Sequence, residues 1–149
     1  MPLSICTDHC GKRTPNPFIT GRMFVIDWNE IISLAGYLEG GGLKGNNLNT
    51  LNYVDHVTRG GKDLFMWALD ANMPPEAWNE LKFNEVTWLD KMNAEIIVVQ
   101  NSSFTCRSGK GAEGGSMIDY IIMSKPLLAL VRFSWPSWTR RGDQTSVLP

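Results

Sequence analysis

Hydrophobic and polar positions divide the chain into a polar start followed by a series of short apolar elements. Residues 1–22 place prolines and glycines between polar residues without an apolar period, so we expect a tail there. A domain is expected over residues 23–149. Its first element, Met-Phe-Val-Ile-Asp at 23–27, predicts a short buried strand. Five glycines within 36–45 then predict a loop.

A helix is predicted after this glycine-rich loop. Its apolar face is spaced in threes and consists of Leu48, Leu51 and Val54. Asn46 or Asn47 is the expected cap, because a side-chain oxygen at that position can accept a free backbone N–H. Gly60 and Gly61 predict the end of the helix, since glycine accepts the left-handed conformation found there.

The second half of the chain predicts several strands and one more helix. The run 64–69 is apolar without alternation, which is typical of a strand covered on both faces. Pro74 and Pro75 predict a helix start, because proline fits the first helical turn. Four further strands are expected at 95–100, 104–106, 117–123 and 127–133. The order of elements predicts an α/β class, with helices packed on a mixed sheet.

Composition narrows the class of protein. A chain of 149 residues with 43% hydrophobic and 19% charged residues is typical of one globular domain. The net charge of −1 argues against a broadly basic surface that coats nucleic acid. Three cysteines cannot all pair, no cationic leader precedes an apolar core, and no apolar run could span a bilayer. We therefore expect an intracellular location, in the nucleus or cytoplasm, without membrane contact.

Asp70 and Asn72 are the first candidates for chemistry. An acid at the carboxyl end of a buried strand, with an amide two residues later, lies where open α/β sheets bind ligands. A carboxylate there can orient a water or bind Mg²⁺, and an amide can donate to a phosphoryl oxygen. The structural alternative is an Asp turn that leads into a helix capped by Asn72.

Asp119 is the second candidate. Alternation through 117–123 would place Met117, Asp119 and Ile121 on one face, so the acid would share its face with apolar residues. A carboxylate in that setting needs a partner, because burial of an unpaired charge is costly. It could orient a histidine or help to hold a metal. The alternative is an acid at the rim of a strand, bonded to backbone amides.

Two ordered motifs resemble the endonuclease/exonuclease/phosphatase superfamily of DNase I-like phosphodiesterases. The family ends one strand in Gly-Asp-Phe-Asn or a variant, where this chain has Leu-Asp-Ala-Asn at 69–72. Met-Pro-Pro-Glu-Ala-Trp at 73–78 is similar to the continuation found in endonucleases of mobile elements, as in retrotransposons. Downstream, Phe-Thr-Cys at 104–106 and the run 116–124, Ser-Met-Ile-Asp-Tyr-Ile-Ile-Met-Ser, match the family's closing motifs. The resemblance covers roughly residues 36–133.

This resemblance implies a layered DNase I-like α/β sandwich that hydrolyses phosphodiester bonds with Mg²⁺ or Mn²⁺. Asp70 would position or deprotonate the attacking water and contact the metal, and Asn72 would hold the phosphate. Asp119 would orient a catalytic histidine, and Asp143 would be a second metal ligand. Nucleic acid is the expected substrate, although RNA, DNA, a lipid phosphate and a small molecule all remain open.

Two further positions are candidates for contact with the substrate. Ser116 opens the second motif, and Lys110 lies in the glycine-rich loop before it. A lysine there could touch a phosphate backbone, and a solvated loop is the alternative.

Several departures from the family predict an incomplete domain with impaired catalysis. The family's amino-terminal half, with its metal-binding Glu, has no convincing counterpart, and Glu30 is the one candidate for that residue. Gln144 stands where the family has its histidine, and glutamine cannot exchange a proton near neutral pH. His56 is expected at the far edge of the sheet. The alternative function is a non-catalytic relic or nucleic-acid-binding module, with self-association or a second chain completing the fold.

Two weaker motifs are given structural interpretations. Cys6, His9 and Cys10 offer three zinc-type ligands, but no fourth follows at metal-site spacing, so a solvated tail is expected. Gly40-x-Gly42-x-x-Gly45 resembles a dinucleotide fingerprint, but no strand is predicted just before it. We therefore interpret it as a flexible loop.

Overall fold

The computed structural model describes residues 23–28, 30–99, 105–107, 115–131 and 138–140. The predicted tail at 1–22 lies outside these ranges, as do Cys6, His9 and Cys10. The helices are α1 (Asn46–Val57), the 3₁₀-helix η1 (Pro75–Asn79), α2 (Trp88–Lys91) and α3 (Lys125–Leu130). The strands are β1 (Met23–Asp27), β2 (Ile31–Tyr37), β3 (Leu64–Asp70), β4 (Lys82–Phe83), β5 (Val86–Thr87), β6 (Ala94–Val99), β7 (Cys106–Arg107), β8 (Gly115–Ser116), β9 (Asp119–Ser124) and β10 (Trp138–Arg140). Among the described residues, no helix has the length and apolar character needed to cross a bilayer.

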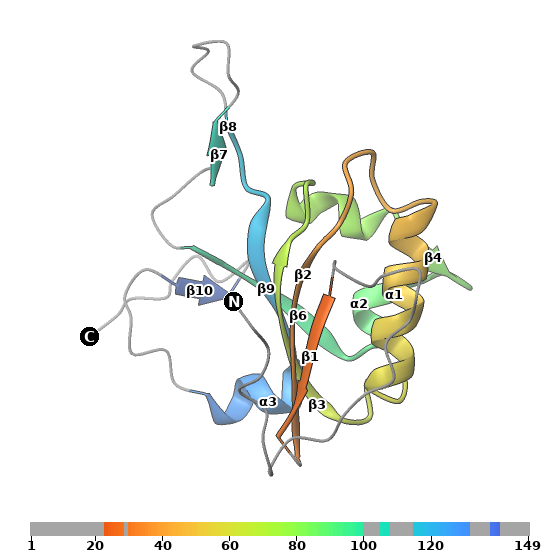
Figure 1. Cartoon of the computed structure of the whole chain (residues 1–149), viewed down its shortest axis with the longest axis vertical. Helices are drawn as coiled ribbons and strands as arrows, with labels where there is room; N and C mark the ends of the chain where they lie inside the picture. The colour runs from red at the N-terminus through yellow and green to blue at the C-terminus, as the bar shows by residue number, and fades with distance from the viewer. Residues whose placement is uncertain (1–22, 29, 100–104, 108–114, 132–137, 141–149) are drawn as a thin grey trace.

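A six-stranded mixed sheet forms the centre of the molecule, in the order β1-β2-β3-β9-β6-β10. Strands β2 and β3 are parallel and are connected through α1, whereas the other neighbouring pairs are antiparallel. Figure 1 shows α1 and α2 on the same side of this sheet. The predicted mixed α/β class is therefore confirmed.

Strand β3 shows why the main core lies on one side of the sheet. Phe65, Trp67 and Leu69 are buried against the helices, whereas Met66 and Ala68 between them are exposed. The prediction that this strand is covered on both faces is wrong. The sequence concealed the alternation because the residues on the open face are also apolar.

The structure of the glycine-rich segment differs from the prediction for the loop and for the cap of the helix that follows. Strand β2 extends to Tyr37 and includes Gly36, so a strand does precede the glycine motif and the loop begins later than expected. Gly45, not an asparagine, is the N-cap of α1. The buried Asn47 side chain instead braces the loop: its Oδ1 accepts the Glu39 N–H, and its Nδ2 donates to the carbonyls of Glu39 and Gly42. The Asn47 side-chain amide therefore makes the hydrogen bonds of this loop, at the place where a dinucleotide fingerprint would bind a phosphate.

The segment predicted as a strand at 127–133 begins as a helix, so that prediction is wrong over its described part. Helix α3 starts after Ser124 with Pro126 in its first turn. Leu127 and Leu128 pack against Ile97 and Met123 on the sheet face opposite to α1. A short apolar run fits a buried strand or a buried helix equally well, and here the proline and the packing decide.

Two other predicted elements differ in extent. The helix expected after Pro74 is the single 3₁₀ turn η1, which buries Trp78. The strand expected over 117–123 is divided, because Met117 and Ile118 lie between β8 and β9.

Candidate functional site

Asp70 and Asp119 lie directly opposite each other on neighbouring strands. Asp70 is the last residue of β3 and Asp119 is the first residue of β9, and the antiparallel register pairs their Cα atoms. Paired residues of an antiparallel ladder share one face, with Cβ atoms about 5 Å apart. Asp70 is half-buried and Asp119 is exposed. Two carboxylates far apart in sequence therefore meet at one end of the sheet, on the face away from α1.

The Asp turn that the sequence left open as an alternative is present, but Asn72 does not cap the helix that follows, whose N-cap is Pro74. Asn72 has a left-handed φ of 50°, and its backbone N–H donates to Asp70 Oδ1 over 3.1 Å. Its side-chain Nδ2 donates to the Leu38 carbonyl over 2.6 Å. The amide thus ties the end of β3 to the segment after β2. This bond uses one of its two N–H groups, so Asn72 retains a second donor and its carbonyl oxygen.

Thr105 fixes the backbone at Asp119. Its Oγ1 accepts the N–H groups of both Ile118 and Asp119, each over 3.0 Å. Its own N–H donates to the carbonyl of Ser116 over 2.8 Å. The sequence placed Thr105 in a strand motif but did not indicate its hydrogen bonds to the backbone of Ile118 and Asp119. These bonds depend on the pairing of β7 with β8, which a local pattern does not specify.

A buried hydrogen-bonded pair supports the two carboxylates from the helix side of the sheet. Tyr120 follows Asp119, and its hydroxyl donates to the carbonyl of Met73, which follows Asn72. Trp78 Nε1 donates to the same hydroxyl over 2.7 Å. The segments that carry Asp70, Asn72 and Asp119 are therefore joined beneath the sheet as well as along it.

Tyr37 is a neighbour of the site that the sequence reasoning missed. It ends β2, and the parallel register pairs its Cα with that of Asp70. Its side chain is 43% exposed. Its hydroxyl is a hydrogen-bond donor on the same rim as the two carboxylates. Recognition of β2 as a strand would have found it, but the glycines that follow obscured that strand.

The remaining candidates fall elsewhere. Ser116 is exposed in β8, where its Cα pairs with that of Cys106. Lys110, Asp143 and Gln144 lie outside the described residues. Glu30 precedes the start of β2, about 20 Å along the strand from the Asp70 end, so it cannot be a ligand at this rim. His56 is exposed in the last turn of α1, on the other side of the sheet.

Two carboxylates are a reasonable but minimal donor set for Mg²⁺. This ion is commonly held by one or two carboxylates, with water and substrate phosphate completing its octahedron. Asp70 and Asp119 meet that requirement. Within the described ranges, no group of three or more His, Cys, Asp or Glu side chains could hold a metal. The residues therefore fit a metal ion whose remaining ligands are water and substrate phosphate better than an ion held entirely by protein side chains.

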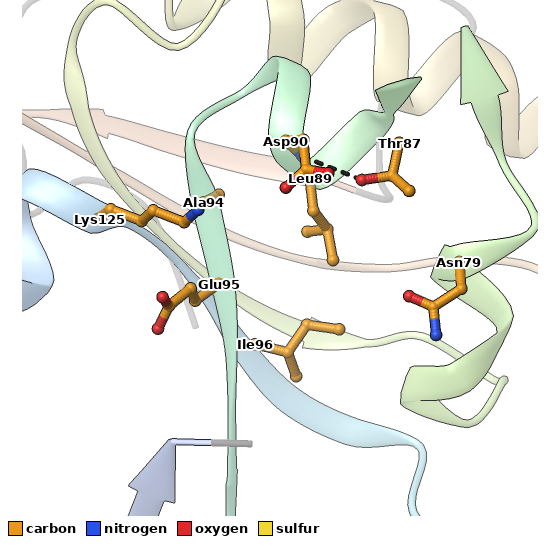
Figure 2. A pocket seen from close by; sticks show the side chains of 8 residues that line it. All are labelled: Asn79, Thr87, Leu89, Asp90, Ala94, Glu95, Ile96 and Lys125. Carbon is orange, nitrogen blue, oxygen red and sulfur yellow. Dashed lines mark hydrogen bonds between the residues drawn. The ribbon is translucent and has the colours of Figure 1, made fainter. Parts of the chain in front are cut away.

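A cavity of about 400 Å³ lies away from this rim. Figure 2 shows its polar lining, which includes Asn79, Thr87, Asp90, Glu95 and Lys125. Ala94, also in the lining, pairs with Ser124 at the opposite end of β9 from Asp119. The cavity is thus separate from the candidate site, which is an open rim.

Comparison with known proteins supports the fold through structural similarity and not through sequence similarity. No family model matches the chain, and a search of curated proteins finds no match. The structure is similar to the endonuclease domain of TRAS1, a telomere-specific non-LTR retrotransposon, with 18% identity and a TM-score of 0.53 over 75% of this chain and 54% of that chain. A second neighbour is the 3′ phosphatase NExo from Neisseria, bound to a product DNA hairpin, with 16% identity and a TM-score of 0.44 over 76% of this chain and 57% of that chain.

The fold is therefore DNase I-like, as the TRAS1 domain shows. The likeness is one of fold. The chain spans about half the length of the neighbours that it matches.

Proposed function

We propose that this chain is a Mg²⁺-dependent phosphodiester hydrolase module that acts on nucleic acid, with Mn²⁺ able to replace Mg²⁺. The observation that carries the proposal is the pairing of Asp70 with Asp119 at the open rim of the sheet. The fold supports it, since the TRAS1 neighbour is an endonuclease domain. We also propose an intracellular site of action, in the nucleus or cytoplasm.

Each residue of the rim has a distinct role in this proposal. Asp70 Oδ1 accepts the Asn72 N–H, so Oδ2 is the oxygen that orients and deprotonates an attacking water. The free donor of the Asn72 amide binds an oxygen of the phosphate. Phosphoryl transfer needs such positioning and charge stabilisation more than covalent participation by the protein.

Mg²⁺ is assigned to the two carboxylates together. When bound there, the ion would neutralise phosphate charge and lower the pKa of a coordinated water. The Thr105 hydroxyl accepts the Asp119 N–H, so the backbone that carries this carboxylate is fixed before substrate arrives. Lys110, between β7 and β8, is proposed to contact the phosphate backbone.

A specific observation favours a second candidate function, a non-catalytic module that binds nucleic acid. His56 lies on the other side of the sheet and Glu30 at its other end, so neither can supply the proton transfer or the third metal ligand. A rim without those groups could retain phosphate and metal binding without efficient cleavage.

A plasmid-cleavage assay tests the proposal with Asp70→Asn and Asp119→Asn. Each substitution preserves side-chain size and removes the charge that holds the metal, so we expect Mg²⁺-dependent cleavage to fall by about 100-fold or more. Asp90→Asn is the matched control, because Asp90 is also exposed but lies in α2 beside the separate cavity. EDTA should abolish cleavage by the wild type.

Other outcomes of this assay separate the candidates. Full cleavage by Asp70→Asn would contradict the proposal. If the wild type does not cleave but binds an oligonucleotide, and Asp70→Asn changes its Mg²⁺ affinity in a calorimetric titration, the binding module is the better description.

A further inference from the structure

The face of the sheet opposite to α1 carries an exposed apolar surface over its first three strands. The register aligns Phe24, Ala35 and Ala68 across β1, β2 and β3. Tyr37 and Met66 lie on the same face by alternation along their strands. We define these five residues as the β1–β3 patch. Phe24 and Tyr37 are each 43% exposed and Met66 is 36% exposed.

Charge indicates the chemistry of the partner that this patch fits. Strands β1, β2, β3 and β9, all described, contain no lysine or arginine, and the rim beside the patch carries Asp70 and Asp119. Phosphate backbones are bound largely through lysine and arginine. The patch is therefore poorly suited to stack nucleic acid, despite its aromatic rings, and is suited to an apolar protein surface.

Strand β1, which borders the patch, is an edge of the sheet among the described strands. Soluble proteins commonly guard edge strands with lysine, proline or a bulge, because an open edge pairs with other chains. Strand β1 is such an edge, and its sequence Met-Phe-Val-Ile-Asp contains neither lysine nor proline. The patch thus continues to an edge on which a packed partner could extend its contact.

The size of the patch sets the expected affinity. A fully buried aromatic side chain covers about 150–250 Å². At the exposures given above, the patch offers on the order of 300 Å², whereas a stable interface takes about 800 Å² from each partner. The patch can therefore form the centre of a weak interface, with the rest supplied by the surrounding sheet and edge.

We propose that the β1–β3 patch is a self-association surface on which a second copy of this chain packs, patch against patch. Helices α1 and α2 cover the other face of the sheet (Figure 1). The five residues of the patch carry no charge, so two patches can pack together without repulsion between like charges. A two-fold contact of this kind uses the same residues on both copies and closes as a dimer.

Sedimentation velocity of the whole chain, from low to high micromolar concentration, tests this proposal with Phe24→Lys. We expect a concentration-dependent monomer–dimer equilibrium for the wild type. Phe24→Lys should raise the dissociation constant by about 10-fold or more, because it places two like charges at the centre of the contact. Val86→Lys is the matched control: Val86 is 45% exposed, lies in β5 and should leave the equilibrium unchanged.

Three results would overturn the proposal. The first is a wild type that remains monomeric at every concentration, which would also be the result if a different protein covered the patch. The second is an equal loss of dimer in Val86→Lys, with near-ultraviolet circular dichroism showing both variants folded. The third is Phe24-dependent binding of a single-stranded oligonucleotide by a monomer. If Phe24→Lys does not fold, Ala68→Lys tests the same patch from the neighbouring strand β3, with the same expected increase in the dissociation constant.

Discussion

At the scale of single residues, three buried tryptophans pack together beneath the candidate site. Trp67 and Trp78 meet edge to face with ring centroids 6.4 Å apart, and Trp88 lies 5.5 Å from Trp78. The polar atoms of the first two differ in their surroundings. Trp78 Nε1 donates to the Tyr120 hydroxyl, whereas the buried Trp67 Nε1 has no partner among the described residues. One indole is therefore held by packing and hydrogen bonding, and the other by packing alone.

This difference predicts unequal effects for the same substitution. Trp67→Phe and Trp78→Phe remove the same atoms from fully buried positions, so their losses of packing should be similar. Trp78→Phe also removes a donor from the Tyr120 hydroxyl and should lower the free energy of unfolding by about 1–2 kcal/mol more. Urea unfolding at matched protein concentration measures both. Equal losses would show that the Trp78–Tyr120 bond contributes no net stability.

At the scale of elements, the turn after α1 is tied closely to the end of α2. Lys91 Nζ lies 2.6 Å from Asp55 Oδ2, which joins the two helices at the surface. Beside this pair, Gly61 has a φ of 80°, and a Cβ added there would lie 2.4 Å from the Met92 carbonyl oxygen. The glycine therefore both adopts a left-handed backbone in the turn after α1 and allows two backbones to approach each other.

We expect Gly61→Ala to destabilise the fold by about 2–4 kcal/mol, because it adds a steric overlap to a left-handed backbone. The overlap is with main-chain atoms, so no side chain can move aside to relieve it. Gly40→Ala is the control, since a Cβ there meets nothing within 4 Å. Thermal or urea unfolding should show little change at Gly40. Similar values at both positions would contradict the close approach.

At the scale of the whole molecule, the sheet is unevenly covered. Helices α1, η1 and α2 bury one face with the tryptophan cluster, and α3 covers part of the other through Leu127 and Leu128. The β1–β3 patch remains exposed. A small domain that leaves apolar area in water has less of the hydrophobic driving force that must offset conformational entropy.

Association through the patch should therefore contribute to measured stability. Mass action predicts that the thermal midpoint of the wild type rises with protein concentration, because only the folded chain dimerises. For Phe24→Lys the midpoint should depend little on concentration. Calorimetric scans over the same range as the sedimentation experiment make the measurement. A wild-type midpoint that is constant over that range would indicate that the monomer is stable without a partner.

Local patterns were enough to predict much of the fold. The glycines after α1, the apolar run of β3 and the proline-led turn at η1 depend on neighbouring residues, and all were located within a few positions. Strand β2 and helix α3 were missed because local signals misled: glycines hid the end of β2, and the apolar run that opens α3 fits helix or strand. The open face of β3 could not be inferred, since Met66 and Ala68 are as apolar as their buried neighbours.

The same division holds at the candidate site. The sequence by itself determined that Asp70 ends a buried strand with Asn72 two residues later, because the strand pattern is local. It predicted Asp119 within a strand at 117–123, whereas the structure makes Asp119 the first residue of β9. Only the tertiary structure decided that Asp70 faces Asp119, that Tyr37 joins them and that the Asn72 amide binds the Leu38 carbonyl. Pairing between strands joins residues separated by tens of positions. It is set by the register of the whole sheet, which no short stretch of sequence specifies.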